Sequence, residues 1–415
     1  MATILFRNAT LVDATSTQAR EGFDVLVEGD RIKEVSDTPI KAADAREIDL
    51  KGATLMPGLI DAHVHVKATD LDLSRLGVKP SSYIYAETTK IMEGMLQRGF
   101  TTVRDAAGAD KGLADAVDHG LIAGPRLRVC GLSLSQTGGH SDQRPLTVMS
   151  DASSIERHNL MQHFGRLADG VDECRRAARD ELRKGAHHVK IMAGGGVSSP
   201  TDPIENTQYS MDELIAINQE AEAWNTYTMA HTYTPRAIQM CVEAGTRTLE
   251  HCNLIDVETA EMVAEHDAYH VPTSITYYAL NKHGKEYGFP DVSIEKLKTI
   301  VDAGLGAVEI SKNAGVKIGF GTDLLGPCHH YQANEFGLAA QVLGNHGALK
   351  SSLETNAEIM YMENEIGKVQ AGFKADLIVV DGNPLEDITC LENDGEKIPL
   401  VMRDGIIFKD RQGIV

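Results

Sequence analysis

The sequence lacks the basic clusters, long apolar runs and signal segments typical of nucleic-acid-binding, membrane and secreted proteins. Forty lysines and arginines stand against sixty aspartates and glutamates, without any basic cluster, so we expect no nucleic-acid partner. No run of about 18 apolar residues occurs, which excludes a membrane-spanning helix. The first residues also lack the basic and apolar segments of a secretory signal. We therefore expect a cytoplasmic protein without a membrane partner.

Cysteine is also scarce, with six in 415 residues and no Cys-x-x-Cys pair. A disulfide framework or a structural zinc finger needs paired or closely spaced cysteines. We therefore expect buried, reduced thiols.

The middle of the chain alternates short apolar runs with amphipathic helical patterns. Four clear helical patterns are SYIYAETTKIMEGMLQRG, VDECRRAARDELRKG, SMDELIAINQEAEAW and PRAIQMCVEAG. Eight repeated strand and helix units favour an α/β fold, a (β/α)8 TIM barrel over residues 58–366. The eight expected strands are LIDAHVH, TTVRDA, RLRVCG, HHVKIM, YTMAH, RTLEH, HVPTSI and KIGFGTD.

Both ends of the chain instead show short strands separated by turns. Examples are ILFRNATLVD near the start and KADLIVVDGNP near the end. We predict that residues 1–57 and 367–415 together form one small discontinuous β-sandwich domain.

Six potential metal ligands lie at or just after the carboxyl ends of the expected strands. In a parallel barrel these ends meet at one face, so the spacing predicts a single metal centre. His63 and His65 share one face of a strand, because strand side chains alternate with period two. The other four are Lys190, His231, His251 and Asp323.

Lys190 is the unusual member of this set. A protonated ammonium repels a divalent cation, so a lysine at a buried strand end needs a partner or a lowered pKa. Two interpretations remain open from the residues alone: a salt-bridged barrel lysine, or a lysine carboxylated by carbon dioxide.

The combined motifs resemble the amidohydrolase superfamily over essentially the whole chain. The resemblance is carried by LMPGLIDAHVH, the strand-four lysine, MAHTY, LEHCN, GFGTD and KADLIVVDGNP. Within that superfamily, FTTVRDAAG, SQTGGH, KIMAGGGVSSPTDP and AHTYTPRAI are similar to metal-dependent prolidase-type carboxypeptidases and dipeptidases, which are imidazolonepropionase-like.

This resemblance implies a binuclear centre of two divalent ions, usually zinc. His63, His65 and Asp323 would hold one ion, His231 and His251 the other, and carboxylated Lys190 would bridge both. Asp323 would act as general base and then general acid. Assembly into a homo-oligomer is also implied by the resemblance alone.

Three further residues are candidates for contact with a small-molecule substrate: His140 and Tyr233 as catalytic and substrate-binding groups that hydrogen-bond a developing oxyanion, carbonyl or carboxylate, and Arg236 for binding alone. His140 follows a TGG turn after the third strand, and Tyr233 lies two residues after His231. Arg236 offers a cation for a substrate carboxylate, although it falls in the first turn of the next helix. For Arg104 we expect a structural ion pair with Asp105 or another carboxylate near the centre. The polar segment 141–169 and the segment AGGGVSSPTDPIEN after the fourth strand are candidate rim loops.

The predicted activity is hydrolysis of the amide bond to the C-terminal residue of dipeptides or N-acyl amino acids, with Xaa-Pro favoured. Aromatic N-acyl amino acids of the ochratoxin type, or Xaa-Arg and Xaa-Lys dipeptides, are alternatives. A non-catalytic assembly protein is the alternative from another class.

Overall fold

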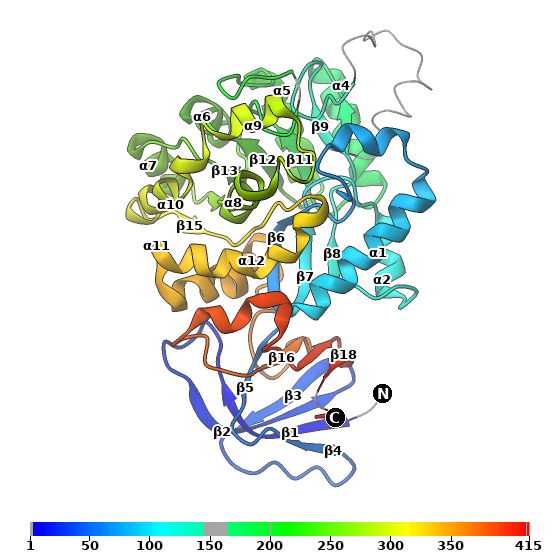
Figure 1. The fold of residues 1–415 in the computed structure, drawn as a ribbon, viewed down its shortest axis with the longest axis vertical. Helices are drawn as coiled ribbons and strands as arrows, with labels where there is room; N and C mark the ends of the chain where they lie inside the picture. Colours follow the sequence, from blue (N-terminus) through cyan, green and yellow to red (C-terminus); the bar gives the residue numbers. More distant parts are fainter. Residues whose placement is uncertain (1–2, 145–163, 200, 412, 415) are drawn as a thin grey trace.

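A computed structural model describes residues 3–144, 164–199, 201–411 and 413–414 of the chain. A (β/α)8 barrel, the upper part of Figure 1, stands on a sheet in which both ends of the chain take part. The fold is therefore α/β with an added sheet, as the sequence predicts.

The lower sheet has eight strands drawn from the two ends of the chain. It is one continuous hydrogen-bonded sheet rather than two separate ones. The junction is β5, which pairs in parallel with β1 and antiparallel with β16, so each end completes the other. Apolar side chains from both ends, Phe6 and Leu377 among them, are fully buried in its core. The strands are β1 (Thr3–Leu11), β2 (Arg20–Glu28), β3 (Arg31–Ser36), β4 (Arg46–Asp49), β5 (Thr54–Pro57), β16 (Leu377–Val380), β17 (Leu400–Arg403) and β18 (Ile406–Asp410).

Each of the eight segments predicted as barrel strands contains a strand. Backbone hydrogen bonds bring the barrel's edges together: Ala62 N donates to Phe320 O at 2.8 Å, and His187 N donates to Val129 O at 2.7 Å. The barrel strands are β6 (Leu59–Val64), β7 (Phe100–Asp105), β8 (Arg126–Arg128), β11 (Val189–Met192), β12 (Thr228–Thr232), β13 (Thr248–His251), β14 (Tyr269–Val271) and β15 (Lys317–Ile318).

Helices surround the barrel, and the four helical patterns of the sequence coincide with α1, α4, α5 and α6. The start of α5 is fixed by a capping box, in which Ser210 and Glu213 satisfy each other's backbone amides. The helices are α1 (Ser81–Gln97), α2 (Lys111–Asp118), α4 (Val171–Arg183), α5 (Met211–Ala223), α6 (Pro235–Glu243), α7 (Val257–Glu265), α8 (Ser274–His283), α9 (Asp291–Leu297), α10 (Gly304–Asn313), α11 (Glu335–Lys350) and α12 (Asn356–Ile359).

Two short strands that the sequence did not predict lie after the third barrel strand. They are β9 (Ser133–Ser135) and β10 (Gly165–Leu167), and β9 pairs with β11. Three residues are too few for a period-two pattern to be recognised. Short helical turns complete the described chain: η1 (Leu73–Val78), η2 (Val301–Ala303), η3 (Gly326–Asn334), η4 (Ser351–Thr355), η5 (Ile388–Leu391) and η6 (Asn393–Gly395).

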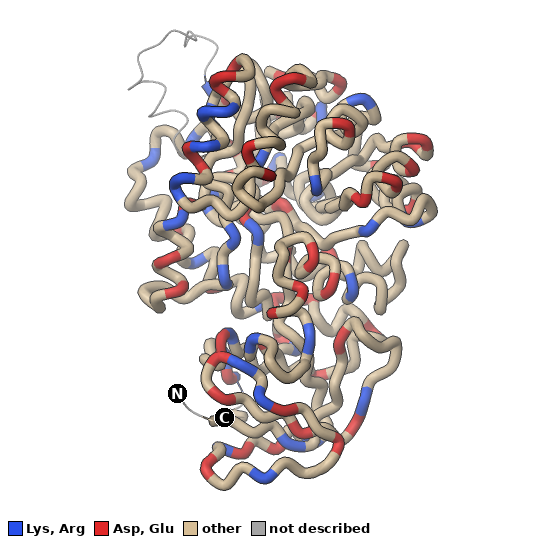
Figure 2. The backbone as a smooth tube through the Cα atoms, turned by 180° about the vertical axis from the view of Figure 1, so that it is seen from behind, with Lys and Arg blue, Asp and Glu red and all other residues tan. Residues whose placement is uncertain are grey.

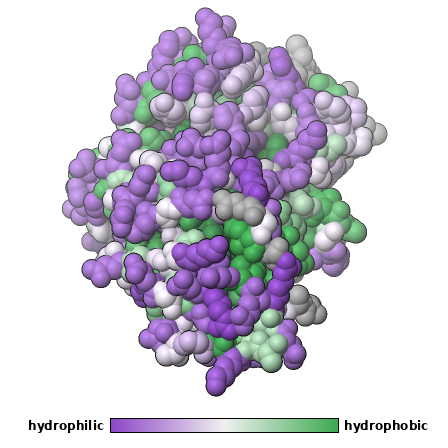
Figure 3. Space-filling model, turned by 60° about the horizontal axis from the view of Figure 1, so that its bottom comes forward, coloured by the Kyte–Doolittle hydropathy of each residue, from purple (hydrophilic) through white to green (hydrophobic). Residues whose placement is uncertain are grey.

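Charges of both signs are interspersed along the outer helices and the lower sheet (Figure 2). Hydrophilic side chains cover much of the face seen when the lower end is turned forward, with hydrophobic side chains exposed between them (Figure 3). No helix in the described ranges has the length and apolar content to cross a membrane. All six cysteines are buried and free, which confirms the expectation of reduced thiols.

Candidate active site at the barrel mouth

The predicted metal ligands converge on one cavity at the carboxyl ends of the barrel strands. The cavity measures about 660 Å³, including its part open to solvent. Apolar side chains such as Leu73, Phe164 and Leu280 form much of its wall. It is lined by all six predicted ligands and both ring-bearing substrate candidates: His63, His65, His140, Lys190, His231, Tyr233, His251 and Asp323.

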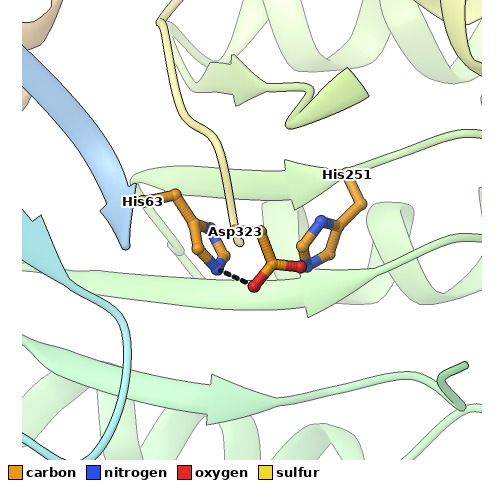
Figure 4. A group of neighbouring side chains, drawn as sticks. All are labelled: His63, His251 and Asp323. Atoms are coloured by element: carbon orange, nitrogen blue, oxygen red, sulfur yellow. Dashed lines mark ion pairs between the residues drawn. The ribbon is translucent and has the colours of Figure 1, made fainter. Parts of the chain in front are cut away.

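Three of these side chains form a tight donor group (Figure 4). The ligand atoms of His63, His251 and Asp323 all lie within 4.8 Å of one another. Asp323 Oδ1 is 3.4 Å from His63 Nε2 and 3.1 Å from His65 Nε2. Asp323 is held there by its backbone, since its N–H donates to His63 O at 2.8 Å.

His231 and Lys190 lie beside this group rather than within it. The His231 ring is 4.6 Å from the His251 ring between centroids, and its Nε2 faces Gly195 O at 3.0 Å. Lys190 is 1% exposed and is the second of the four residues of β11. Burial lowers the pKa of Lys190, although the nearby carboxylates of Glu250 and Asp323 oppose this.

His251 and Asp323 both adopt left-handed backbone conformations, with φ of 74° and 51°. Residues with side chains rarely adopt positive φ, and such strain clusters at functional sites. The turn in the backbone carries both side chains over the barrel mouth.

A buried ion network lies directly below the cavity and orients His63. His63 Nδ1 is 2.6 Å from Glu250 Oε2, and Arg104 donates to Glu250 Oε1 at 2.9 Å. Arg104, Glu250 and His63 are at most 1% exposed. Burial by itself would raise the pKa of Glu250, but Arg104 and His63 hold it below its usual value. The expected structural ion pair of Arg104 is thus confirmed, with Glu250 as its partner.

Sequence reasoning missed Glu250 for a geometric reason. Strand alternation places neighbours on opposite faces, so Glu250 and the candidate ligand His251 should not both serve one site. The left-handed turn at His251 breaks the alternation. The one sequence signal was an acidic residue within the otherwise uncharged strand TLEH.

The donor set fits a divalent cation. Glu250 occupies Nδ1 of His63, while the buried Nε2 makes no close hydrogen bond within the described residues and faces Asp323 Oδ1 at 3.4 Å. A carboxylate behind an imidazole whose other nitrogen faces a cavity is a usual arrangement for metal-binding histidines. Burial lowers the pKa of His231 and of His251 well below the usual value, which favours the neutral, ligating imidazole. Imidazole nitrogens and a carboxylate are common zinc ligands.

His140 and Tyr233 both reach the cavity, as predicted. The His140 ring stacks on His231 at 4.2 Å between centroids. Burial raises the pKa of the Tyr233 phenol above its usual value, so it remains a neutral hydrogen-bonding group. Its hydroxyl lies 3.1 Å from that of Tyr277, a cavity-lining residue of α8 that the sequence analysis did not single out.

The predicted role of Arg236 is not supported by its position. Arg236 lies in the first turn of α6, its side chain is exposed, and it is not among the residues that line the cavity. After Pro235 opens the helix, the next side chain projects toward solvent. Of the predicted rim loop, residues 145–163 lie outside the described residues; Phe164 of the same segment lines the cavity.

Comparison with known proteins agrees with this geometry. Ochratoxinase from Aspergillus niger is 30% identical over 388 residues, which cover 90% of this chain and 79% of that protein. A solved amidohydrolase structure is 50% identical with a TM-score of 0.97, and covers 99% of this chain and 100% of that one. The crystal structure of a prolidase complexed with N-methylphosphonate-L-proline is 46% identical with a TM-score of 0.95, at 99% and 100% coverage.

The barrel, its site and these similarities define a hydrolase that acts on carbon–nitrogen bonds. Residues 54–407 match the Amidohydrolase family, and the chain belongs to this family, which is generally metal-dependent. The resemblance seen in the sequence motifs, including that to prolidase-type relatives, is confirmed.

Proposed function

We propose that this protein is a binuclear metal hydrolase that removes the C-terminal residue from dipeptides or N-acyl amino acids, with Xaa-Pro favoured. The observation that carries the proposal is the gathering of His63, His251 and Asp323 within 4.8 Å in a cavity with apolar walls. The similarity to the prolidase complexed with N-methylphosphonate-L-proline supports proline as the leaving residue.

We infer that His63, His65 and Asp323 hold one ion and that His231 and His251 hold the other. Lys190, carboxylated by carbon dioxide, would supply oxygens to both. A lowered pKa favours this modification, because only the neutral amine attacks carbon dioxide. Two bound cations, zinc in our proposal, would polarise the scissile carbonyl and lower the pKa of a water molecule between them.

Asp323 is the proposed proton carrier. Burial would raise the pKa of its carboxyl, but His63 and His65 hold it well below the usual value, so Asp323 is ionised and able to accept a proton. It would take a proton from the attacking water and return it to the leaving amine. His140 and Tyr233 would hydrogen-bond the developing oxyanion or the substrate carboxylate.

The charges of the residues that line the cavity favour some leaving residues over others. Asp323 is the one acidic side chain among the described residues that line the cavity, and its Oδ1 already lies 3.1 Å from His65 Nε2 and 3.4 Å from His63 Nε2. A basic C-terminal residue would therefore lack a carboxylate partner, which argues against Xaa-Arg and Xaa-Lys. Hydrolysis of aromatic N-acyl amino acids is the second candidate, supported by the 30% identity with ochratoxinase.

A kinetic screen of the zinc-loaded protein tests this proposal. Dipeptides and N-acyl amino acids would be varied at the C-terminal residue alone. We expect kcat/KM for proline to exceed that for arginine or lysine by about tenfold or more, within the range that one or two side chains provide. Faster cleavage of basic substrates would refute the proposed preference, and no cleavage of any would refute the activity.

Metal analysis separates the enzyme from a non-catalytic assembly protein. The enzyme should contain about two transition-metal ions per chain, whereas a scaffold should contain none in stoichiometric amount. Assembly into a homo-oligomer stays a prediction, to be measured by light scattering.

A further inference from the structure

The imidazole of His140 is confined by close packing. One contact is the stack on His231, with the ring planes 17° apart. The backbone of Gly196 packs so closely that a Cβ built there would overlap the His140 ring. His140 therefore depends on the loop between β11 and α5 for its position.

One edge of the ring is held by hydrogen bonds. His140 Nδ1 lies 2.9 Å from Ser199 Oγ and 3.4 Å from Asp202 Oδ2. The Ser199 hydroxyl donates to Asp202 Oδ1, so Ser199 Oγ is left to accept from Nδ1–H. This order of donors places a proton on Nδ1 and leaves Nε2 for the cavity side, where Ser198 Oγ lies at 3.3 Å.

Asp202 also ties the backbone of His140 to the same loop. It is 1% exposed, and its Oδ2 accepts from Gly196 N at 3.0 Å and from Gln208 Nε2 at 3.0 Å. The amide oxygen of Gln208 in turn accepts from His140 N at 2.9 Å. A single buried carboxylate thus joins the edge of the ring, the packed glycine and the residue's own main chain.

Lys296 of α9 fixes this loop from outside the barrel. Its Nζ donates to three carbonyl oxygens of the loop, those of Gly196 at 2.9 Å, Ser199 at 2.8 Å and Asp202 at 2.6 Å. Three donors meeting three acceptors use the full capacity of an ammonium group. Neither Lys296 nor Asp202 lines the cavity, so neither is placed to touch a substrate.

We propose that Asp202 and Lys296 are positioning residues: Asp202 fixes the ring orientation of His140, and Lys296 fixes the loop that carries Asp202. This inference deepens the proposed function and rests on its assignment of His140 to the reacting carbonyl or the substrate carboxylate. The alternative is that the network only stabilises the loop.

A double-mutant cycle distinguishes the two roles. In Asp202→Asn, an amide donor replaces Oδ2 and faces the donors on His140 and Gln208, which should turn the ring. We expect kcat to fall about 10–100-fold, the usual cost of losing an orienting partner, with little change in KM. In a His140→Ala background the same substitution should cost less than about twofold, because the residue it orients is gone. Equal losses in both backgrounds would overturn the proposal.

Lys296 provides a second variant that leaves the buried carboxylate in place. Lys296→Met should also lower kcat, and Lys296→Arg should restore part of the loss, since a guanidinium can donate to several carbonyls. The matched control is Lys298→Met, because Lys298 lies two residues further on and pairs with exposed Glu295. Metal content and melting temperature, measured on every variant, identify any that fail to fold. Loss in Lys298→Met equal to that in Lys296→Met would contradict the assignment.

Crystal structures of the two variants give a readout that needs no turnover. We expect the His140 ring to be rotated or displaced in Asp202→Asn and in Lys296→Met, with the other cavity residues in place. An unmoved ring in both would overturn this proposal. If the unaltered protein cleaves none of the screened substrates, the proposed function fails, while the position of the ring still decides this inference.

Discussion

At the scale of single residues, the site depends on a few charges buried close together. Burial alone would raise the pKa of the Asp323 carboxyl, but His63 and His65 keep it ionised, as the proposed proton-transfer role requires. His63 stands between Asp323 and Glu250, and Asp323 first and then Glu250 raise its pKa against the effects of burial and of Lys190. A position between two carboxylates favours positive charge, whether the charge is a proton or a cation.

Asp323→Asn should remove the proton carrier while leaving an oxygen ligand. We expect kcat to fall about 10²–10⁴-fold, the usual contribution of general acid–base catalysis, with most of the metal retained. Turnover and metal content would be measured together, with Asp212→Asn in the exposed first turn of α5 as the control. Full activity of Asp323→Asn would exclude the proton-transfer role.

Lys190→Ala tests the proposed carboxylation of this lysine. The variant should lose activity and bound metal, and a short carboxylic acid with bicarbonate should restore part of both, because it supplies the missing oxygens. Lys184→Ala, at the exposed end of α4, should match the unaltered protein. Unchanged activity of Lys190→Ala without any added anion would remove the carbamate from the mechanism.

Glu250→Gln tests the orientation of His63. An amide cannot accept from both His63 and Arg104, so one buried donor loses its partner. We expect metal affinity to weaken about 10–100-fold, measured by competition with a chelator. Glu258→Gln, on the exposed surface of α7, is the control. Equal affinities of the two variants would show that Glu250 does not act on the metal site.

At the scale of elements, the sequence predicts most of the barrel because each strand and helix carries its own pattern. Eight short apolar runs became strands, and Ser210 and Thr234 capped the helices that follow the fourth and fifth of them. The candidate ligands were therefore expected to meet at one cavity, because parallel strands end at one face.

The sequence could not predict the side-chain contacts between residues that lie far apart in the chain. Asp202 lies in an irregular loop, and its partner Lys296 comes from a helix 94 residues further on. The role of Glu250 beside His63 could be recognised only from the structure, because it depends on the left-handed backbone turn at His251. Arg236 was predicted to face the cavity because it lies close to His231 in the sequence. Its orientation depends instead on its position around helix α6, which points the side chain to solvent.

The start of α8 provides a test of pH dependence, since this helix carries Tyr277 to the cavity. Glu335 accepts from Ile275 N at 2.6 Å, and burial raises the pKa of its carboxyl to about 8. The folded protein therefore holds a proton that the unfolded chain has released above about pH 4.5. Folding stability from this group is fully present below about pH 4.5 and is lost as pH rises to about 8.

Glu335→Gln removes this titration and keeps an oxygen that can accept from Ile275. The melting temperature of Glu335→Gln minus that of the unaltered protein should increase as the pH is raised from 5 to 8.5. Glu309→Gln, on the exposed face of α10, should show no such trend. A constant difference between Glu335→Gln and the unaltered protein over this range would contradict the raised pKa.

At the scale of the whole molecule, partly buried ion pairs join the barrel to the lower sheet. Arg126 of β8 donates to Asp376, which directly precedes β16, at 2.6 Å and to Asp404, between β17 and β18, at 2.5 Å. Arg126→Met leaves the buried Asp376 without this cation, whereas Asp404 keeps Lys374 at 3.3 Å, so the change should cost about 1–3 kcal/mol of unfolding free energy. The surface pair of Arg183 and Asp180 is worth about 0–1 kcal/mol, so Arg183→Met is the control. Urea unfolding compares the two, and equal losses would exclude a special role for Arg126.

The way the sheet closes has a consequence for biosynthesis. Thr54 donates to Gly382 O across 328 positions of the chain, and β5 cannot pair with β16 before that later segment exists. While the barrel is being synthesised, the nascent β5 has one edge without a hydrogen-bonding partner, and its apolar side chains are not yet covered by β16. Chaperones that bind unpaired strand edges could therefore bind the nascent chain during most of its translation. Truncated products that lack β16 would keep this unpaired, aggregation-prone edge.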